Sequence, residues 1–250
     1  MRISGRVALV TGASSGIGRA SALRLADAGA RLLLHGRDRD RLAALAERTG
    51  GIPLVGDLAG AGEADRLAAE ALRLVEAVDI VVCNAGIGWA GPFEAMGAGD
   101  IERLVAVNLV APMRLTRALL PGMLARACGY LMYVTSIAGR TGVAGEAVYA
   151  ATKAGLDTFA ESLRLEARGT GVGVGVFVPG VVATEFFARR GRPYERALPQ
   201  PLPADRVADL LVDQIAAGGA ERYAPGWLRL PVAVRATMPG LYRQLAAWFG

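Results

Sequence analysis

The chain has 250 residues, of which 53% are hydrophobic and 20% charged, as expected for a folded globular protein rather than a disordered one. The formal net charge is +5, but the arginines are scattered, so we expect a solvated basic surface and no nucleic-acid-binding patch. One histidine, His35, and two cysteines without C-x-x-C spacing argue against a zinc site, against any other metal site and against a Ser-His-Asp hydrolase.

The N-terminal residues run directly into a strand-like segment, RVALVTG. They lack the long apolar region and the cleavage site of a signal peptide. No run of 18 uncharged apolar residues follows, so no membrane-spanning helix is expected. Cytoplasmic location is therefore the expectation.

Strand-like and helix-like segments then alternate along the chain. The strands are continuous Val, Ile and Leu runs, which indicates burial on both faces in a parallel sheet covered by helices. Repeated β-α units predict an α/β fold with a doubly wound parallel sheet, helices on both faces, and one domain over residues 1–250. The predicted strands are 6–12, 31–36, 52–56, 79–83, 130–136 and 172–178, and the predicted helices are 16–29, 38–49, 63–75, 100–126, 148–168 and 204–217.

Two segments break this alternation. Residues 181–203 hold four prolines and two adjacent phenylalanines, and a connection of this length predicts a substrate lid. Residues 225–250 form an apolar C-terminal tail with Trp227, Trp248 and three arginines. We expect the tail to be a helix packed on the domain or on a partner subunit, with contact to a membrane surface as the alternative.

The first strand leads into the first helix through a glycine-rich turn, TGASSGIG. Glycine lets the backbone approach a pyrophosphate, whose charge would meet the free N–H groups at the helix start. The spacing is G-x-x-x-G-x-G rather than the commoner G-x-G-x-x-G. This position, after a strand and before a helix, predicts a phosphate-binding loop.

Lysine and asparagine are rare in this chain, so we expect each of them to be kept where its chemistry is needed. Lys153 is the only lysine, and Asn84 and Asn108 are the only asparagines. Tyr149 and Lys153 are four apart on a predicted helix, hence on one face. A neighbouring ammonium lowers the pKa of a tyrosine and helps it to exchange a proton with a substrate oxygen. Ser136, after the fifth strand, can hydrogen-bond the same oxygen.

These motifs, in this order, resemble the short-chain dehydrogenase/reductase family from about residue 6 to residue 184: TGASSGIG, then N-A-G at 84–86, Ser136, Tyr149-x-x-x-Lys153, and Pro179-Gly180. The resemblance implies a Rossmann fold, a nicotinamide cofactor, Tyr149 as the general acid/base, and a homodimer or homotetramer. It also implies that Asn108 holds a water linking Lys153 to solvent. The cofactor-binding residues it implies are Gly12, Ser14, Ser15, Gly16, Ile17, Gly18, Arg37, Asp57, Leu58, Asn84, Ala85, Gly86, Tyr149, Lys153, Pro179, Gly180, Val182 and Thr184.

The end of the second strand favours NADP(H) over NAD(H). An acidic residue there would bind a ribose 2′-OH, whereas this chain has Gly36 followed by Arg37, whose guanidinium can bind a 2′-phosphate. Asp38 is the competing signal for NAD(H), and we interpret it as the cap of the following helix.

Apolar side chains on loops at the same sheet edge predict the substrate class. Trp89, Ile137, Phe186 and Phe187, together with Phe93 and Val182, suggest a ketone or secondary alcohol of an apolar or aromatic small molecule. Reduction is the expected direction with NADPH. The alternatives are a non-catalytic NADP-binding sensor or scaffold, a sugar-nucleotide epimerase or dehydratase, and a reductase of lipid ketones at a membrane surface.

Overall fold

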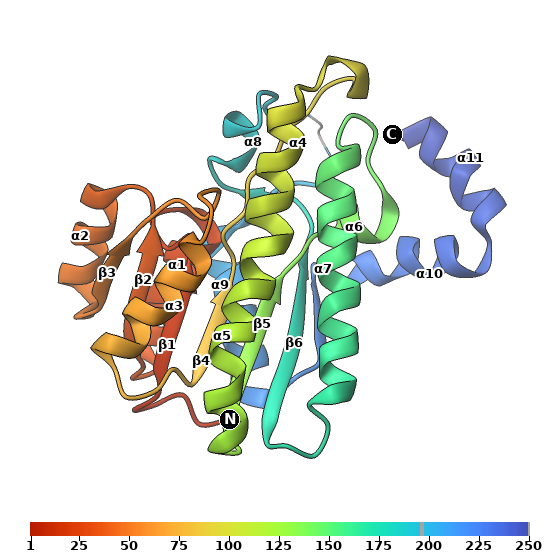
Figure 1. The fold of residues 1–250 in the computed structure, drawn as a ribbon. Coiled ribbons are helices and arrows are strands. Elements are labelled where there is room, and N and C mark those ends of the chain that lie inside the picture. The colour runs from red at the N-terminus through yellow and green to blue at the C-terminus, as the bar shows by residue number, and fades with distance from the viewer. Residues whose placement is uncertain (196–197, 250) are drawn as a thin grey trace.

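The computed structural model describes residues 1–195 and 198–249, with side chains described up to residue 246. Arg196 and Ala197 of the predicted lid, Gly250, and the side chain of Trp248 in the tail therefore lie outside the described part. The central feature is a parallel seven-stranded sheet in the order β3-β2-β1-β4-β5-β6-β9 (Figure 1). Its strands are β1 (Val7–Thr11), β2 (Arg31–Gly36), β3 (Ile52–Val55), β4 (Ile80–Cys83), β5 (Gly129–Val134), β6 (Val172–Pro179) and β9 (Glu221–Ala224).

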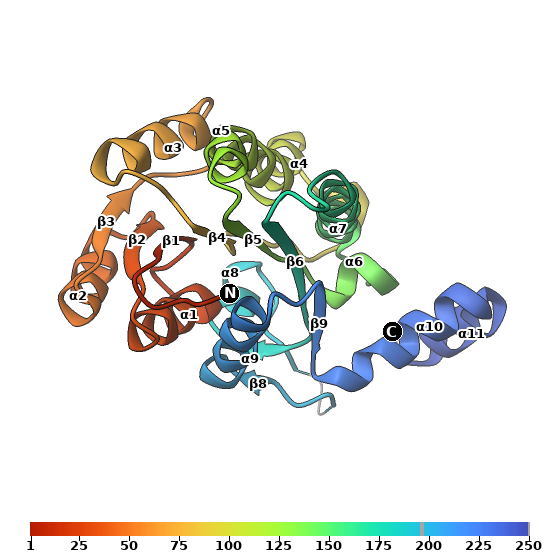
Figure 2. The ribbon, with the colours of Figure 1, turned by 90° about the horizontal axis from the view of Figure 1, so that it is seen from below.

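Helices cover both faces of this sheet, as Figure 2 shows. One face packs against α3 (Glu63–Leu74), α5 (Ala111–Ala125) and α7 (Ala147–Glu166), and the other against α1 (Gly16–Asp27), α2 (Arg39–Thr49) and α9 (Ala204–Ala217). The predicted α/β fold class, a doubly wound parallel sheet, is confirmed.

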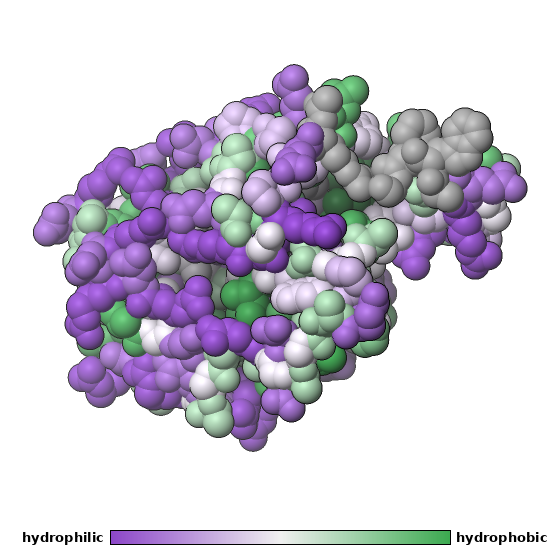
Figure 3. Space-filling view, turned by 90° about the horizontal axis from the view of Figure 1, so that it is seen from above, coloured by the Kyte–Doolittle hydropathy of each residue, from purple (hydrophilic) through white to green (hydrophobic). Residues whose placement is uncertain are grey.

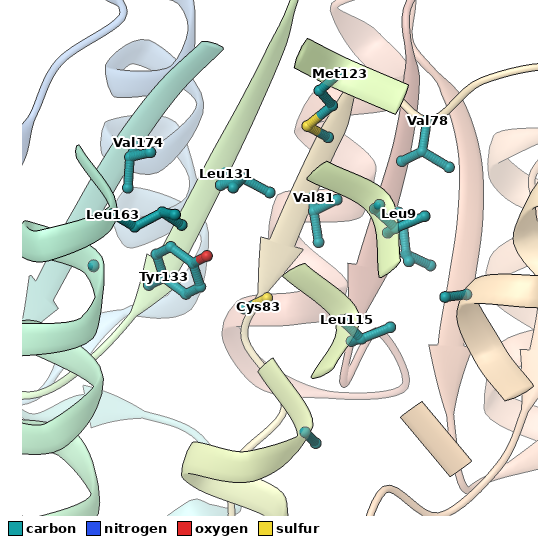
Figure 4. Packing of buried hydrophobic residues seen from close by; sticks show 14 of the residues in the cluster. Leu9, Val78, Val81, Cys83, Leu115, Met123, Leu131, Tyr133, Leu163 and Val174 are labelled. Atoms are coloured by element: carbon teal, nitrogen blue, oxygen red, sulfur yellow. The ribbon is translucent and has the colours of Figure 1, made fainter. Parts of the chain in front are cut away.

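A hydrophobic core lies on each face of the sheet, which explains why the strands are apolar throughout. The first core lies between the sheet and the helices α3, α5 and α7. Leu115 and Met123 of α5 pack against Leu9, Val81 and Leu131 of three neighbouring strands (Figure 4). The helical run Ala98–Ala125 is long and apolar enough by composition to span a membrane. The buried apolar residues of its α5 part belong to this core, and Leu104 belongs to a smaller buried cluster, as expected for a core helix of a globular domain.

β1 and β4 are adjacent in the sheet. On the β1 side the next strands along the chain, β2 and β3, extend the sheet in one direction, whereas the strands after β4 extend it in the opposite direction. Loops that leave the carboxyl ends of these strands diverge there and open a crevice, where ligands of α/β sheets usually bind. The polar residues singled out in the sequence therefore meet at this edge.

Several elements differ from the sequence prediction. The predicted helix 100–126 consists of α4 (Ala98–Val105), a π-helical turn η2 (Ala106–Val110) and α5. Strand β9 and the short helix α6 (Ile137–Thr141) were not predicted. β9 is a polar edge strand without the apolar run that marks the others.

The lid and the tail have secondary structure of their own. Within the lid, β7 (Val182–Ala183) pairs with β8 (Leu202–Pro203), and α8 (Phe186–Arg189) follows β7. After the 3-10 turn η3 (Gly226–Leu228), the tail forms α10 (Arg229–Thr237) and α11 (Pro239–Phe249). Both tail helices project away from the body (Figures 1 and 2), so the expected packing against the domain is limited.

Candidate active site

The phosphate loop leaves β1 and enters α1 in the predicted place. A Cβ at Gly18 would lie 2.3 Å from the Gly12 carbonyl oxygen, and Gly16 has a φ of +53°, so larger residues would disturb this turn. Ser15 precedes α1 without capping it through its side chain. The first-turn amides of α1 thus remain donors, which fits the phosphate groups of a dinucleotide.

Asn84 fastens the phosphate loop to the end of β4. Its Nδ2 donates to the Thr11 carbonyl at 2.9 Å, and the Thr11 hydroxyl accepts from the amides of Asn84 and Ala85, each at 3.1 Å. The predicted N-A-G segment therefore shapes the loop through its hydrogen bonds. Within this segment Asn84 and Ala85 are partly buried, and Gly86 is exposed.

Asn108 lies in the π-helical turn η2 and is fully buried. Its Oδ1 accepts from the Ile87 amide and its Nδ2 donates to the Ile87 carbonyl, each at 2.9 Å. Nδ2 also reaches the Thr152 hydroxyl on α7 at 3.2 Å. A π turn re-aims side chains relative to a regular α-helix, and here it ties the loop after β4 to α7.

Ser136, Tyr149 and Lys153 converge beside this contact. Ser136 caps the N-terminus of α6, with its hydroxyl oxygen accepting from the Ala138 amide at 3.1 Å. Lys153 Nζ donates to the Val134 carbonyl at 2.9 Å and lies 5.9 Å from the centre of the Tyr149 ring. A Cβ at Gly86 would lie 3.4 Å from both Lys153 Nζ and Asn108 Oδ1, so all four predicted catalytic side chains share one small region.

Burial shifts the pKa values of both Lys153 and Tyr149. It lowers the pKa of Lys153 to about 8, with Asp157 opposing. It raises the pKa of Tyr149 to about 12, although a hydrogen bond with Ser136 acts in the other direction. The expectation that a neighbouring ammonium lowers the Tyr149 pKa is therefore wrong for this structure, because desolvation of the phenol outweighs the nearby charges.

The lid provides that desolvation. The Phe186 ring packs on the Tyr149 ring with centroids 5.4 Å apart, and Phe186 and Trp89 join the cluster around Tyr149 and Leu104. Arg190 pairs with Glu146 at the start of α7, and both side chains are nearly buried. This ion pair holds the lid over Tyr149.

A cavity of about 40 Å³ lies beside Tyr149, between the loop after β4 and the start of α7, with room for about one or two waters. Apolar side chains line much of it, among them Trp89, Phe93, Met96 and Val148, with Tyr149 at its wall. Seen from the carboxyl edge, this face of the protein is mostly hydrophilic, with apolar side chains recessed near its middle (Figure 3). A substrate larger than water therefore requires this cavity to widen.

The adenosine end of the crevice has a network of charges. Asp38 accepts from the Arg41 amide at 3.0 Å and caps α2, as predicted. Arg37 is exposed and lies 3.8 Å from the Asp57 carboxylate, which Arg103 also contacts at 2.9 Å. Leu58 has its side chain in the core, so only its backbone can face an adenine ring.

Other predicted residues lie apart from Tyr149. The Val182 side chain is buried in the second core, Ile137 packs against the first core, and Phe187 stacks within the lid on Tyr194 and under Arg190. Pro179 and Gly180 end β6, where the Gly180 amide donates to the Ala224 carbonyl at 2.8 Å. Thr184 packs on Gly16, with its methyl group 3.0 Å from where a Cβ of Gly16 would lie.

The sequence interpretation missed several charged residues at this edge, namely Arg41, Glu146, Glu185, Arg189 and Arg190. Arg189 and Glu185 are four residues apart, but the Arg41–Glu185 and Arg190–Glu146 pairs join segments far apart in sequence, which no local pattern could have indicated. The described residues contain no group of His, Cys, Asp and Glu that could hold a metal ion.

Comparison with known proteins identifies the family. The family profile described as short chain dehydrogenase matches residues 6–195. An uncharacterized oxidoreductase of Myxococcus xanthus is 35% identical over 243 residues, which cover 95% of this chain and 94% of the relative. The 3-oxoacyl-[acyl-carrier-protein] reductase FabG of Aquifex aeolicus is 32% identical, over 82% of this chain and 86% of its own length.

Solved structures agree with this assignment. A short-chain dehydrogenase from Sphingobium yanoikuyae in complex with NADPH has a TM-score of 0.83 and 30% identity, covering 97% of this chain and 95% of that chain. A short-chain dehydrogenase/reductase from Burkholderia phymatum in complex with NAD has a TM-score of 0.87 and 26% identity, covering 96% of both chains. Profile, relatives and fold agree with the motifs, and the chain is a member of the short-chain dehydrogenase/reductase family, an oxidoreductase.

Proposed function

We propose that the protein is an NADPH-dependent reductase of apolar or aromatic ketones, with Tyr149 as the proton donor. One observation carries this proposal: Tyr149, close to Ser136 and Lys153, lines a pocket whose other side chains are largely apolar. The complex of the Sphingobium relative with NADPH and the 3-oxoacyl reductase among the relatives support it.

The residues of the site have distinct roles in this proposal. When bound, the nicotinamide cofactor supplies the hydride. With a pKa near 12, Tyr149 holds its proton at neutral pH and can donate it from Oη to the oxygen of the reduced carbonyl. Ser136 Oγ stabilises charge on that oxygen. Lys153 keeps a positive charge near Tyr149, and Asn108 fixes the Ile87 backbone beside them.

Substrate choice is expected to depend on Phe186, which covers Tyr149. Truncation by Phe186→Ala removes this apolar cover, so kcat/KM for an aromatic ketone should fall about tenfold or more. A small hydroxyketone should be affected much less. Steady-state rates with both ketones measure this, and Phe159→Ala, which alters an aromatic ring packed on Tyr133, is the control. Equal losses for both ketones would contradict an apolar substrate site.

Cofactor choice is expected to depend on Arg37. Because a guanidinium binds a phosphate through charge-assisted hydrogen bonds, Arg37→Ala should weaken binding of NADPH about tenfold or more, with NADH unchanged. Calorimetric Kd values for both cofactors measure this, with the exposed neighbour Arg39→Ala as the control. Tighter binding of NADH than NADPH by the unaltered protein would reject the cofactor assignment.

We also propose a homo-oligomer, as is common in this family. The family resemblance places its interface at the helices near 103–126 and 148–168, where large apolar side chains stay exposed, at Val110 of η2, Leu124 of α5 and Leu165 of α7. Exposed apolar side chains on neighbouring helices favour a subunit contact. Dimer and tetramer are both compatible with this surface.

A second candidate function, reduction of a lipid ketone at a membrane surface, is favoured by the tail. Exposed apolar residues and arginines occur together on it, and no Asp or Glu follows Glu221. Basic helices with exposed apolar side chains bind anionic bilayers. The exposed apolar residues are Trp227, Leu230, Met238, Leu241 and Leu245.

Flotation with vesicles tests this second candidate. We expect the protein to float with phosphatidylglycerol vesicles at low salt and not with phosphatidylcholine vesicles. Changing Leu241 and Leu245 to Ser should abolish flotation without changing the activity on a water-soluble ketone. Absence of flotation with either vesicle would reject a membrane-surface reductase.

A further inference from the structure

A set of polar and charged contacts joins the lid to the start of α2 and to the phosphate loop. Arg41 Nη1, near the start of α2, lies 2.9 Å and 3.1 Å from the two carboxylate oxygens of Glu185 in the lid. Arg189 of α8 contacts the same carboxylate, and its Nη1 lies 3.2 Å from Ser15 Oγ in the phosphate loop. Two guanidiniums from distant segments thus hold one carboxylate beside the phosphate loop.

This arrangement has the chemistry of a phosphate site. Guanidinium forks bind carboxylate and phosphate oxygens with similar geometry. Arg189 adds its charge where the uncapped first turn of α1 already presents amides. Arg41 adds its charge on the adenosine side of the crevice, four residues after Arg37 in the sequence. Besides Glu185, Arg41 pairs with Asp38, at 3.3 Å.

We propose that Arg41 and Arg189 form a phosphate clamp that binds one anion at a time, either the Glu185 carboxylate or phosphate oxygens of the dinucleotide. This inference rests on the proposed NADPH-dependent function and adds three residues to it. Arg189 serves the diphosphate, which NADPH and NADH share. Arg41 serves the 2′-phosphate, which only NADPH has. Glu185 competes with both and holds the lid closed over the loop.

The positions of the three residues support this division. Arg189 contacts Ser15, the residue just before the helix expected to hold the diphosphate. Arg41 is about half exposed, so its guanidinium can leave Glu185 for another anion without loss of core packing. Arg41 holds the pKa of the Glu185 carboxyl below its ordinary value, so the carboxylate is charged at neutral pH and competes as an anion.

Calorimetric titration of the full-length protein with NADP, NAD and 2′,5′-ADP tests the clamp without turnover. Arg41→Ala should weaken binding of NADP and 2′,5′-ADP by about tenfold and leave NAD unchanged. Arg189→Ala should weaken NADP and NAD alike. Glu185→Gln, which removes the competing charge, should tighten NADP binding by up to about fivefold. Arg48→Ala, at the far end of α2, is the matched control.

The outcomes separate the clamp from the proposed function. Unchanged Kd values in both arginine variants, with NADP still bound tightly, would overturn the clamp and leave the reductase proposal intact. Unchanged or weaker NADP binding in Glu185→Gln would overturn the competition by Glu185. Failure of the unaltered protein to bind any dinucleotide would overturn both proposals.

Discussion

Replacing Tyr149 by Phe is expected to lower kcat/KM for ketone reduction by about a thousandfold, with a much smaller change, about threefold at most, in the Kd for NADPH. The substitution removes only the hydroxyl that donates the proton, and the ring can still pack on Phe186. Steady-state rates and calorimetric titration measure the two quantities on the same preparation.

Tyr133→Phe is the matched control for this result. Tyr133 is also a buried tyrosine, and its hydroxyl pairs with Thr116 at 2.6 Å within the core. Its loss should cost about 1 kcal/mol of stability and leave turnover intact. A Tyr149→Phe enzyme with unchanged kcat/KM would show that another group supplies the proton.

Replacing Lys153 by Met should lower kcat/KM by about a hundredfold and change its pH dependence. In the unaltered enzyme kcat/KM should fall as pH rises through about 8, where Lys153 loses its proton. Lys153→Met should lack this fall. A pH profile from 6 to 10 measures it, and an identical profile in both proteins would exclude Lys153 as its cause.

Lys153 also makes stability depend on pH. Its folded pKa, about 8, lies below its ordinary value, 10.5, so between these values the unfolded chain binds more protons than the folded one. The contribution of Lys153 to the free energy of unfolding should therefore rise with pH across this window, by up to about 3 kcal/mol, and above about pH 9 buried Cys83, whose pKa burial raises to about 12, opposes it. Urea unfolding measures this contribution as the difference in unfolding free energy between the unaltered protein and Lys153→Met, which should grow in favour of the unaltered protein as pH rises from 8 to 10.

The apolar runs of the sequence were sufficient to predict six of the strands of the central sheet and the helices between them. The edge strand β9 escaped prediction because ERYA has no apolar run, and its pairing with β6 decides its conformation. The π turn at Asn108 has no recognisable pattern in the amino-acid sequence either. It depends on how α4 and α5 join.

The predicted catalytic residues came together because the carboxyl ends of parallel strands share one edge. Contacts of the lid were beyond prediction, since Arg190 reaches Glu146 and Arg41 reaches Glu185 across 44 and 144 residues of sequence. The direction of the Tyr149 pKa shift was predicted wrongly for the same reason. It depends on burial under Phe186, which the spacing of Tyr149 and Lys153 does not reveal.

Absorbance at 340 nm, with NADPH and a panel of aromatic and aliphatic ketones, tests the central claim most directly. We predict ketone-dependent oxidation of NADPH, faster than that of NADH and fastest with apolar or aromatic ketones. Tight binding of NADPH without turnover of any ketone, or of the corresponding alcohols with NADP, would contradict a reductase and favour a protein that only binds the cofactor.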